Sequence, residues 1–221
     1  MRRSTVMAAL FVALSPPSAS ANGHAASGTA QAVFIADGEP TLAPMAFLQF
    51  CLKYKSQCAT PSEETPIVIE LTPNNLAEMR SVNAAVNARI APNPAKDGDH
   101  WSLETRYGNC NDYAVQKRDE LARRGFPISA LSLATVMTRD GQGHLVLTVR
   151  TNRGDYVLDN LNAAIMPWNT VRYAWLKRQS AAKPRYWVDL SGSSPAHRAQ
   201  TASSRPQPAH RNRIASAGAP L

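Results

Sequence analysis

Three apolar segments separated by short polar turns constrain the fold of this chain more than any other feature. Residues 131–138, 144–150 and 156–161 are rich in aliphatic and β-branched side chains, which favour strands. Strands joined by turns this short pair antiparallel. Helical patterns come before them, at residues 44–55, 72–90 and 110–124, and further strands follow at 171–179 and 185–190. The sequence therefore predicts an α+β fold with a helical N-terminal half packed against an antiparallel sheet.

A cysteine stands at the start of the helix that leads into this sheet. Asn109 is a good N-cap because its side-chain oxygen can accept from the amides of the first turn, so Cys110 falls on that turn. Gly125 ends the helix. The positive end of the helix dipole favours a thiolate, and the first-turn amides can hold a developing oxyanion. This position predicts a reactive thiol.

A histidine and an aspartate follow on neighbouring strands. His144 begins the second strand and Asp159 lies in the third. A loop of two or four residues between the strands makes the two side chains diagonal neighbours on one face, about 7–8 Å apart, which a hydrogen bond can bridge. A loop of three residues would place them on opposite faces. With the same-face register, Cys110, His144 and Asp159 are predicted to act as nucleophile, base and orienting residue of a thiol enzyme.

The other two cysteines have a structural role in this reading. Cys51 and Cys58 lie close in sequence near the end of an apolar helix, and in an oxidising compartment such a pair forms a disulfide. Within one regular helix the two residues would be roughly 10 Å apart along the axis, which is too far for a disulfide. The helix is therefore expected to end before Cys58.

Several short motifs are similar to those of a known family. They comprise Gly108-x-Cys110-x-Asp112-Tyr113, Gly143-His144-x-Val146-Leu147, Val157-Leu158-Asp159-Asn160-Leu161, Val82-Asn83-x-x-Val86-Asn87 and Asp99-x-Trp101. With these motifs the region from about residue 45 to 190 resembles the bacterial transglutaminase-like cysteine proteinases, which have a papain-like and transglutaminase-like fold.

The resemblance implies the same roles as the residue pattern. It makes Cys110 the nucleophile, His144 the base and Asp159 the orienting residue of a peptidase. It also places supporting residues near the substrate cleft, namely Asn87, Trp101, Asn109 and Asp112.

One departure from the family concerns calcium. Better-known members are periplasmic proteases that depend on calcium and clip large biofilm adhesins, and they have acidic residues on both sides of the cysteine. This chain has Asn109 and Asn111 there, and only Asp112 keeps its charge. Because calcium prefers several oxygen ligands that include carboxylates, the sequence predicts no cofactor and no firm metal site. A weak calcium site near Asp112 is the remaining alternative.

The start of the chain predicts export, and the sequence as a whole divides into four regions. Residues 1–21 have a basic start, a short apolar core and an Ala-Ser-Ala cleavage site, which is typical of a signal peptide, with an uncleaved anchor as the alternative. Residues 22–40 are expected to form a flexible mature N-terminus, residues 41–190 the proteinase domain and residues 191–221 a disordered basic tail. The expected location is the periplasm or the outside of the cell.

The charge distribution limits the classes of partner. The net charge is +8, but two arginines lie in the expected signal peptide and four in the tail, which leaves about +2 for the folded part. No clustered basic face predicts nucleic-acid binding, and no later segment is apolar enough to cross a membrane. We expect a monomer whose partner is a protein substrate in the periplasm or at the cell surface.

Two other functions are alternatives to the peptidase. One uses the same three residues, and the other does not need their chemistry. A thioacyl intermediate captured by an amine instead of water would give a transglutaminase or an amidase. The chain could also be a catalytically silent binding module of the cell envelope, in which Cys110 would react no faster than a free thiol. The retained Cys110, His144 and Asp159 argue against the silent module.

Overall fold

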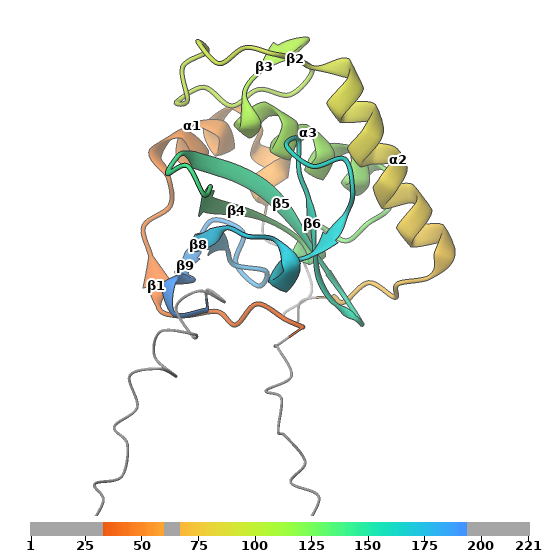
Figure 1. Ribbon diagram of the computed structural model, residues 1–221. Coiled ribbons are helices and arrows are strands. Elements are labelled where there is room, and N and C mark those ends of the chain that lie inside the picture. Colours follow the sequence, from red (N-terminus) through yellow and green to blue (C-terminus); the bar gives the residue numbers. More distant parts are fainter. Residues whose placement is uncertain (1–32, 60–66, 194–221) are drawn as a thin grey trace, which may run out of the picture. The chain divides into compact units, whose positions relative to one another are not determined.

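The computed structural model describes residues 33–59 and 67–193. The expected signal peptide at 1–21, the first part of the segment 22–40 and the tail from residue 194 lie outside the described residues. Figure 1 shows the described part as helices packed on one side of a sheet. The helices are α1 (Met45–Lys53), α2 (Pro73–Arg89) and α3 (Cys110–Arg123), with short 3₁₀ turns at Lys55–Cys58, Ile128–Ala130, Trp168–Thr170 and Ser191–Ser193. The protein has the α+β fold that the sequence predicts.

A seven-stranded sheet forms the second layer. Its order is β1-β9-β8-β4-β5-β6-β7, and each pair of neighbours is antiparallel. The strands are β1 (Pro40–Thr41), β4 (Leu131–Met137), β5 (Gly143–Thr151), β6 (Gly154–Leu158), β7 (Met166–Pro167), β8 (Ala174–Gln179) and β9 (Trp187–Asp189). A separate parallel pair joins β2 (Ala91–Pro92) to β3 (Tyr107–Gly108), just before α3.

The hairpin between β5 and β6 decides the register of the site. Thr151 pairs with Gly154, so the loop is the two residues Asn152 and Arg153, which is one of the two loops that put the histidine and the aspartate on one face. The strand β6 ends at Leu158 and not at residue 161 as expected. Asp159 is therefore the first residue after the strand.

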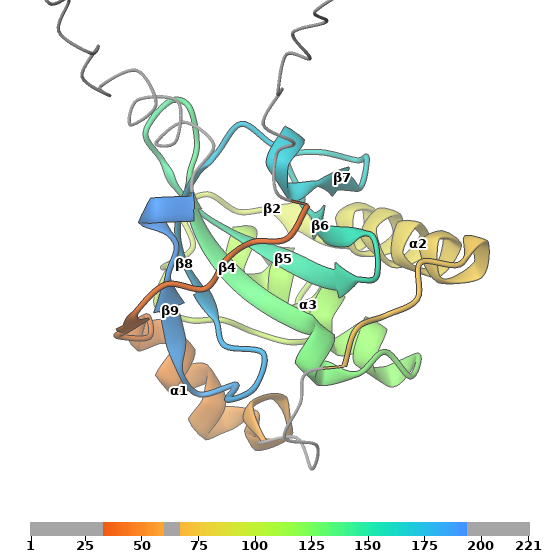
Figure 2. The same ribbon diagram turned by 90° about the horizontal axis from the view of Figure 1, so that it is seen from below.

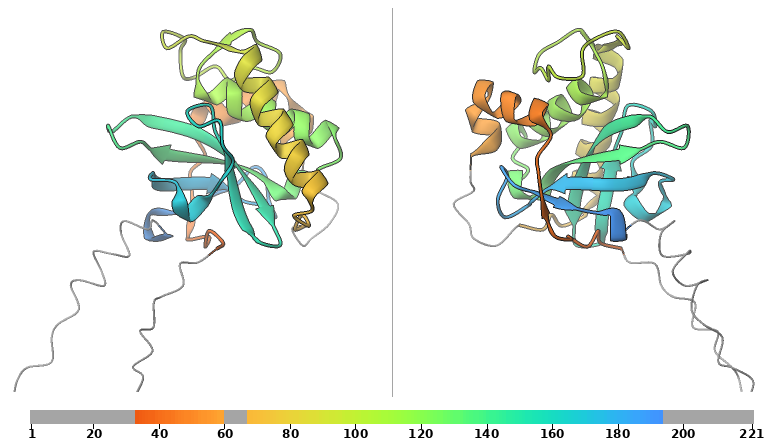
Figure 3. Two further views of the ribbon diagram at one scale, coloured as in Figure 1. Left: turned by 45° about the vertical axis from the view of Figure 1, so that its right-hand side comes forward. Right: turned by 90° about the vertical axis from the view of Figure 1, so that its left-hand side faces the viewer.

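Helix α3 lies between the sheet and α2, and the view in Figure 3 shows α2 on the outer side of α3. Thr72 caps α2 by accepting a hydrogen bond from the Asn75 amide at 3.1 Å, and Pro73 occupies the first turn. The buried side of α2 consists of Met79, Val82, Asn83 and Val86. This packing joins the two helices and the middle of the sheet in one apolar core.

A second apolar cluster covers the other face of the sheet. Residues 33–40, which were expected to be flexible, run across this face in Figure 2. Ile35 is buried there, together with Val136, Val146 and Trp175. The Ile35 amide donates to the buried carboxylate of Asp155 at 2.7 Å. The ordered domain thus begins earlier than residue 41.

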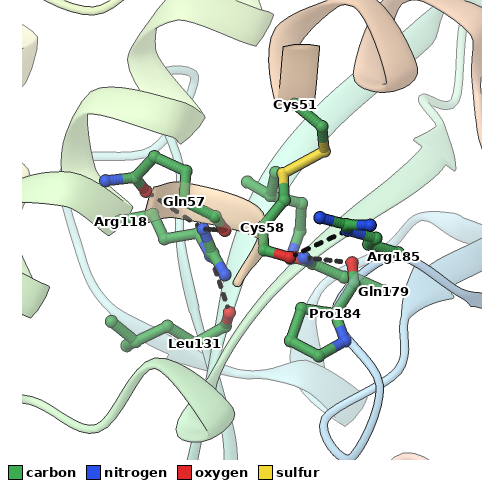
Figure 4. Close-up of a disulfide and its surroundings, with 9 residues drawn as sticks. Cys51, Gln57, Cys58, Arg118, Leu131, Gln179, Pro184 and Arg185 are labelled. Carbon is green, nitrogen blue, oxygen red and sulfur yellow. Dashed lines mark hydrogen bonds between the residues drawn. A yellow bond between two sulfur atoms is a disulfide. The ribbon is translucent and has the colours of Figure 1, made fainter. Parts of the chain in front are cut away.

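The disulfide fastens the end of α1 to the sheet (Figure 4). Cys51 and Cys58 are joined with their Cα atoms 5.5 Å apart, and the helix ends at Lys53, before Cys58, as the sequence predicts. The buried Arg118 of α3 donates to the Gln57 carbonyl at 2.6 Å and to the Leu131 carbonyl at 3.0 Å. The 3₁₀ turn that contains Cys58 is therefore held against both α3 and β4.

Among the residues that the structure describes, no helix is both long enough and apolar enough to span a membrane.

Candidate active site

Cys110 is the first residue of α3 and directly follows the N-cap residue Asn109. The Asn109 side-chain oxygen accepts from the Asn111 amide at 3.2 Å, and the Asp112 carboxylate accepts from the Asn109 amide at 2.9 Å. Gly108 is required in front of this cap, because a Cβ there would lie 2.5 Å from the Asp112 carboxylate oxygen. Cys110 is half-buried and is the one free cysteine in the described part of the chain. The cap holds its thiol at the positive end of the helix dipole.

His144 and Asp159 form a buried pair beside this helix start. His144 Nε2 lies 2.8 Å from Asp159 Oδ1, and both side chains are almost inaccessible to solvent. The same carboxylate accepts from the Leu161 amide at 3.0 Å and from the Tyr173 hydroxyl at 2.6 Å. The Tyr173 ring also packs edge-on against the imidazole, with 5.7 Å between centroids. These contacts leave the imidazole little freedom to turn.

The electrostatics of the pair favour a protonated imidazole. Burial lowers the pKa of His144, but hydrogen bonds with Asp159 and Cys110 and the charges of these two groups outweigh it and raise the pKa to about 9. Burial raises the pKa of Asp159, and the contacts from His144, Tyr173 and Leu161 reverse this and hold that pKa below its usual value. Burial and the neighbouring Asp159 raise the pKa of Tyr173. At neutral pH the arrangement suits an imidazolium beside the Asp159 carboxylate.

Cys110 and His144 open into the same cleft, which has a volume of about 740 Å³. Its wall on the side of the helices includes Met45 and Trp101, and Leu161 contributes from the segment after β6. Asp159 is absent from this lining, because it sits behind the imidazole. A substrate in the cleft can therefore reach the sulfur and the imidazole, while the carboxylate acts only through the ring.

A family model described as bacterial transglutaminase-like cysteine proteinase matches residues 37–195, which is most of the chain. This protein belongs to that family.

Three solved structures of Legionella pneumophila LapG are similar to this protein. One has 21% identity, a TM-score of 0.44, and an alignment over 51% of this chain and 66% of LapG. The EGTA-treated form has 19% identity, a TM-score of 0.41, and covers 49% and 64%. The calcium-bound form has 16% identity, a TM-score of 0.45, and covers 73% and 93%. In the first two alignments the chain thus spans less than two thirds of LapG. No significant match was found among curated proteins.

The supporting residues expected from the sequence lie around Cys110, His144 and Asp159 in different ways. Asn87 donates to the Asp159 carbonyl at 3.0 Å, so it holds the backbone that follows β6. Trp101 is buried in the cleft wall and donates to the Gly98 carbonyl at 3.1 Å. Asn109 and Asp112 form the helix cap.

Two residues near this site were not predicted from the sequence. The hydrogen bond of Tyr173 to Asp159 depends on the strand order of the sheet. Lys117 lies in α3 and is buried, with its Nζ 5.9 Å from the centre of the Tyr113 ring. Burial lowers the pKa of Lys117 to about 7, which the nearby charge of Asp159 opposes. A lysine at helical spacing from the cysteine carries no sequence signal that distinguishes it from a surface residue.

Proposed function

We propose that this protein is an exported cysteine peptidase that hydrolyses peptide bonds of an envelope or surface protein through Cys110, His144 and Asp159. The observation that carries the proposal is the buried His144–Asp159 pair, whose imidazole interacts with the Cys110 thiol at the edge of a cleft. The raised pKa of His144 favours transfer of the thiol proton to the ring, which leaves a thiolate.

The first half of the reaction forms an acyl-enzyme. The Cys110 thiolate attacks the carbonyl carbon, and the backbone amide of Cys110 at the start of α3 donates to the developing oxyanion. The carbon–nitrogen bond then breaks as the His144 imidazolium gives its proton to the leaving amine. Asp159 accepts from His144 Nε2 throughout, so the other ring nitrogen serves the thiol and the leaving group.

The second half releases the product. Neutral His144 takes a proton from water, the water oxygen attacks the thioester, and the carbon–sulfur bond breaks to return the thiolate. An acid is released and His144 again holds the proton. These steps need no cofactor to balance their atoms or charges.

The proposal is tested by comparing the mature protein with its Cys110→Ala variant on a cell-envelope extract. We expect new protein N-termini that depend on Cys110, read by mass spectrometry. The His144→Ala variant should lose nearly all of this activity, and the Cys110→Ala variant should unfold at the temperature of the wild type. Cross-linked products without new termini would instead support acyl transfer to an amine. Equal products from wild type and Cys110→Ala, with a thiol no more reactive than free cysteine, would support a silent binding module.

A further inference from the structure

The two asparagines that flank the cysteine bind the loop that forms one wall of the cleft. Asn109 Nδ2 donates to the Lys96 carbonyl at 3.2 Å, and Asn111 Nδ2 donates to the Gly98 carbonyl at 3.1 Å. Gly98, Asp99 and residues 92–94 line the cleft beside Cys110. The amides of the helix start are therefore direct connections between α3 and residues 96–98.

A lysine makes a third connection between the same two segments. Lys96 Nζ lies 2.5 Å from Asp112 Oδ1, and the Asp112 side chain is inaccessible to solvent. The same oxygen accepts from the Ser102 amide at 2.9 Å, while Oδ2 accepts from the Asn109 amide at 2.9 Å. Both carboxylate oxygens thus have partners within the chain, and the neighbouring positive charge is an ammonium.

The chemistry of these contacts does not fit a calcium site. Calcium binds six to eight oxygens, among them carboxylates. Here the Asp112 carboxylate is already paired with Lys96, and the side chains at 109 and 111 present N–H groups to the loop carbonyls. No group of three or more His, Cys, Asp or Glu side chains within residues 33–59 and 67–193 is placed to hold a metal ion. The residues present therefore disagree with the calcium that the family resemblance implies.

The residue type at 109 and 111 decides which bond can form. An amide nitrogen donates to a carbonyl directly, whereas a carboxylate is only an acceptor and repels the carbonyl oxygen that it faces. With carboxylates at positions 109 and 111, the side-chain oxygens would face the carbonyl oxygens of Lys96 and Gly98. A cation between them would then be needed to hold the loop in place.

We propose that this peptidase fastens its active-site loop without metal, through a latch formed by the Asn109 and Asn111 side-chain amides and the Lys96 ammonium. The three groups join residues 96–98 to the start of α3, where a divalent cation would otherwise be required. Asn109, Asn111 and Lys96 are positioning residues, since they act on the cleft wall and on the cap of Cys110. The prediction for activity rests on the proposed peptidase function, while the prediction for stability does not.

The test is a double variant, Asn109→Asp with Asn111→Asp, compared with the wild-type protein in chelator and in millimolar calcium. The thermal midpoint of the wild type should differ by less than about 2 °C between the two conditions, because no part of its latch is metal. The variant loses two hydrogen bonds, so its midpoint in chelator should fall by about 5 °C. Calcium should restore most of that loss and should bind measurably by calorimetry.

A matched control is Asn75→Asp. Asn75 Nδ2 also donates to a backbone carbonyl, that of Glu70 at 2.8 Å, but on the exposed start of α2 away from the cleft. This control makes the same chemical change and should gain no calcium dependence of activity.

Three results would overturn the latch. One is a wild-type midpoint or activity that falls in chelator and returns with calcium. Another is a double variant whose midpoint and heat of calcium binding match those of the wild type. If the double variant does not fold in chelator, the proposal expects it to fold in calcium. Failure to fold in calcium as well would be the third contradicting result. The single Asn111→Asp variant would then repeat the comparison. Absence of proteolysis in every sample would count against the peptidase alone, because the midpoints still decide on the latch.

Discussion

Replacement of Asp159 by Asn tests whether the charge of this residue sets the proton affinity of His144. The side chains of Asp and Asn have nearly the same shape, so the 2.8 Å contact between His144 Nε2 and Oδ1 can persist while the negative charge is lost. The Leu161 amide and the Tyr173 hydroxyl now meet a neutral group. The substitution should thus change electrostatics more than geometry.

The size of the effect follows from the groups that shift the pKa of His144. The pKa of His144 is raised from 6.5 to about 9 although burial lowers it, and this difference corresponds to roughly 3 kcal/mol. Asp159 contributes both a hydrogen bond and a charge, and Cys110 contributes the rest. In Asp159→Asn we expect the pKa of His144 to fall by roughly 1–2 pH units. Because each pH unit of that fall lowers the equilibrium constant for the imidazolium–thiolate pair about tenfold, kcat/KM at neutral pH should drop by about 10–10².

Two measurements check this prediction. The rate at which iodoacetamide alkylates Cys110, followed against pH, reports the thiolate without any substrate. The pH profile of kcat/KM reports the same ionisations in the free enzyme. In Asp159→Asn the alkaline limb of kcat/KM should move to lower pH and the alkylation rate of Cys110 at neutral pH should fall, while the circular dichroism spectrum stays that of the wild type. An unchanged alkylation profile in a folded variant would refute the assignment of Asp159 as the source of the raised pKa.

Three further predictions concern Tyr173, Lys117 and the disulfide. Tyr173→Phe removes the 2.6 Å bond to Asp159, so urea unfolding should show a loss of about 1.5–3 kcal/mol. Because burial lowers the pKa of Lys117 to about 7 in the folded protein, wild-type stability should rise from that pH up to the unfolded-state pKa of about 10.4. The greater stability of Lys117→Met should be largest at neutral and acid pH and should shrink over the same range. Replacing Cys51 and Cys58 by Ser opens a short loop, and the free energy of unfolding should fall by about 2–3 kcal/mol.

Local sequence was sufficient for the parts of the site that depend on neighbours in the chain. The cap at Asn109 and the helix that starts at Cys110 follow from interactions within a few residues. The two-residue loop between β5 and β6 sets the register, and with it the proximity of His144 and Asp159. The disulfide was predictable for the same reason, since Cys51 and Cys58 are close in sequence.

Only the tertiary structure decided which groups from distant segments lie beside Cys110, His144 and Asp159. β8 pairs with β4, with Ala174 opposite Met137, and this places Tyr173 at the end of the sheet where His144 stands. Likewise, the burial of Ile35 and the ion pair of Lys96 depend on how loops cross the sheet and the start of α3. Periodicity and capping describe a residue and its near neighbours, whereas strand order and loop paths depend on the packing of the whole core. The sequence by itself therefore determined the helix start, the hairpin and their reactive residues, and the fold determined the hydrogen bonds and charges that surround them.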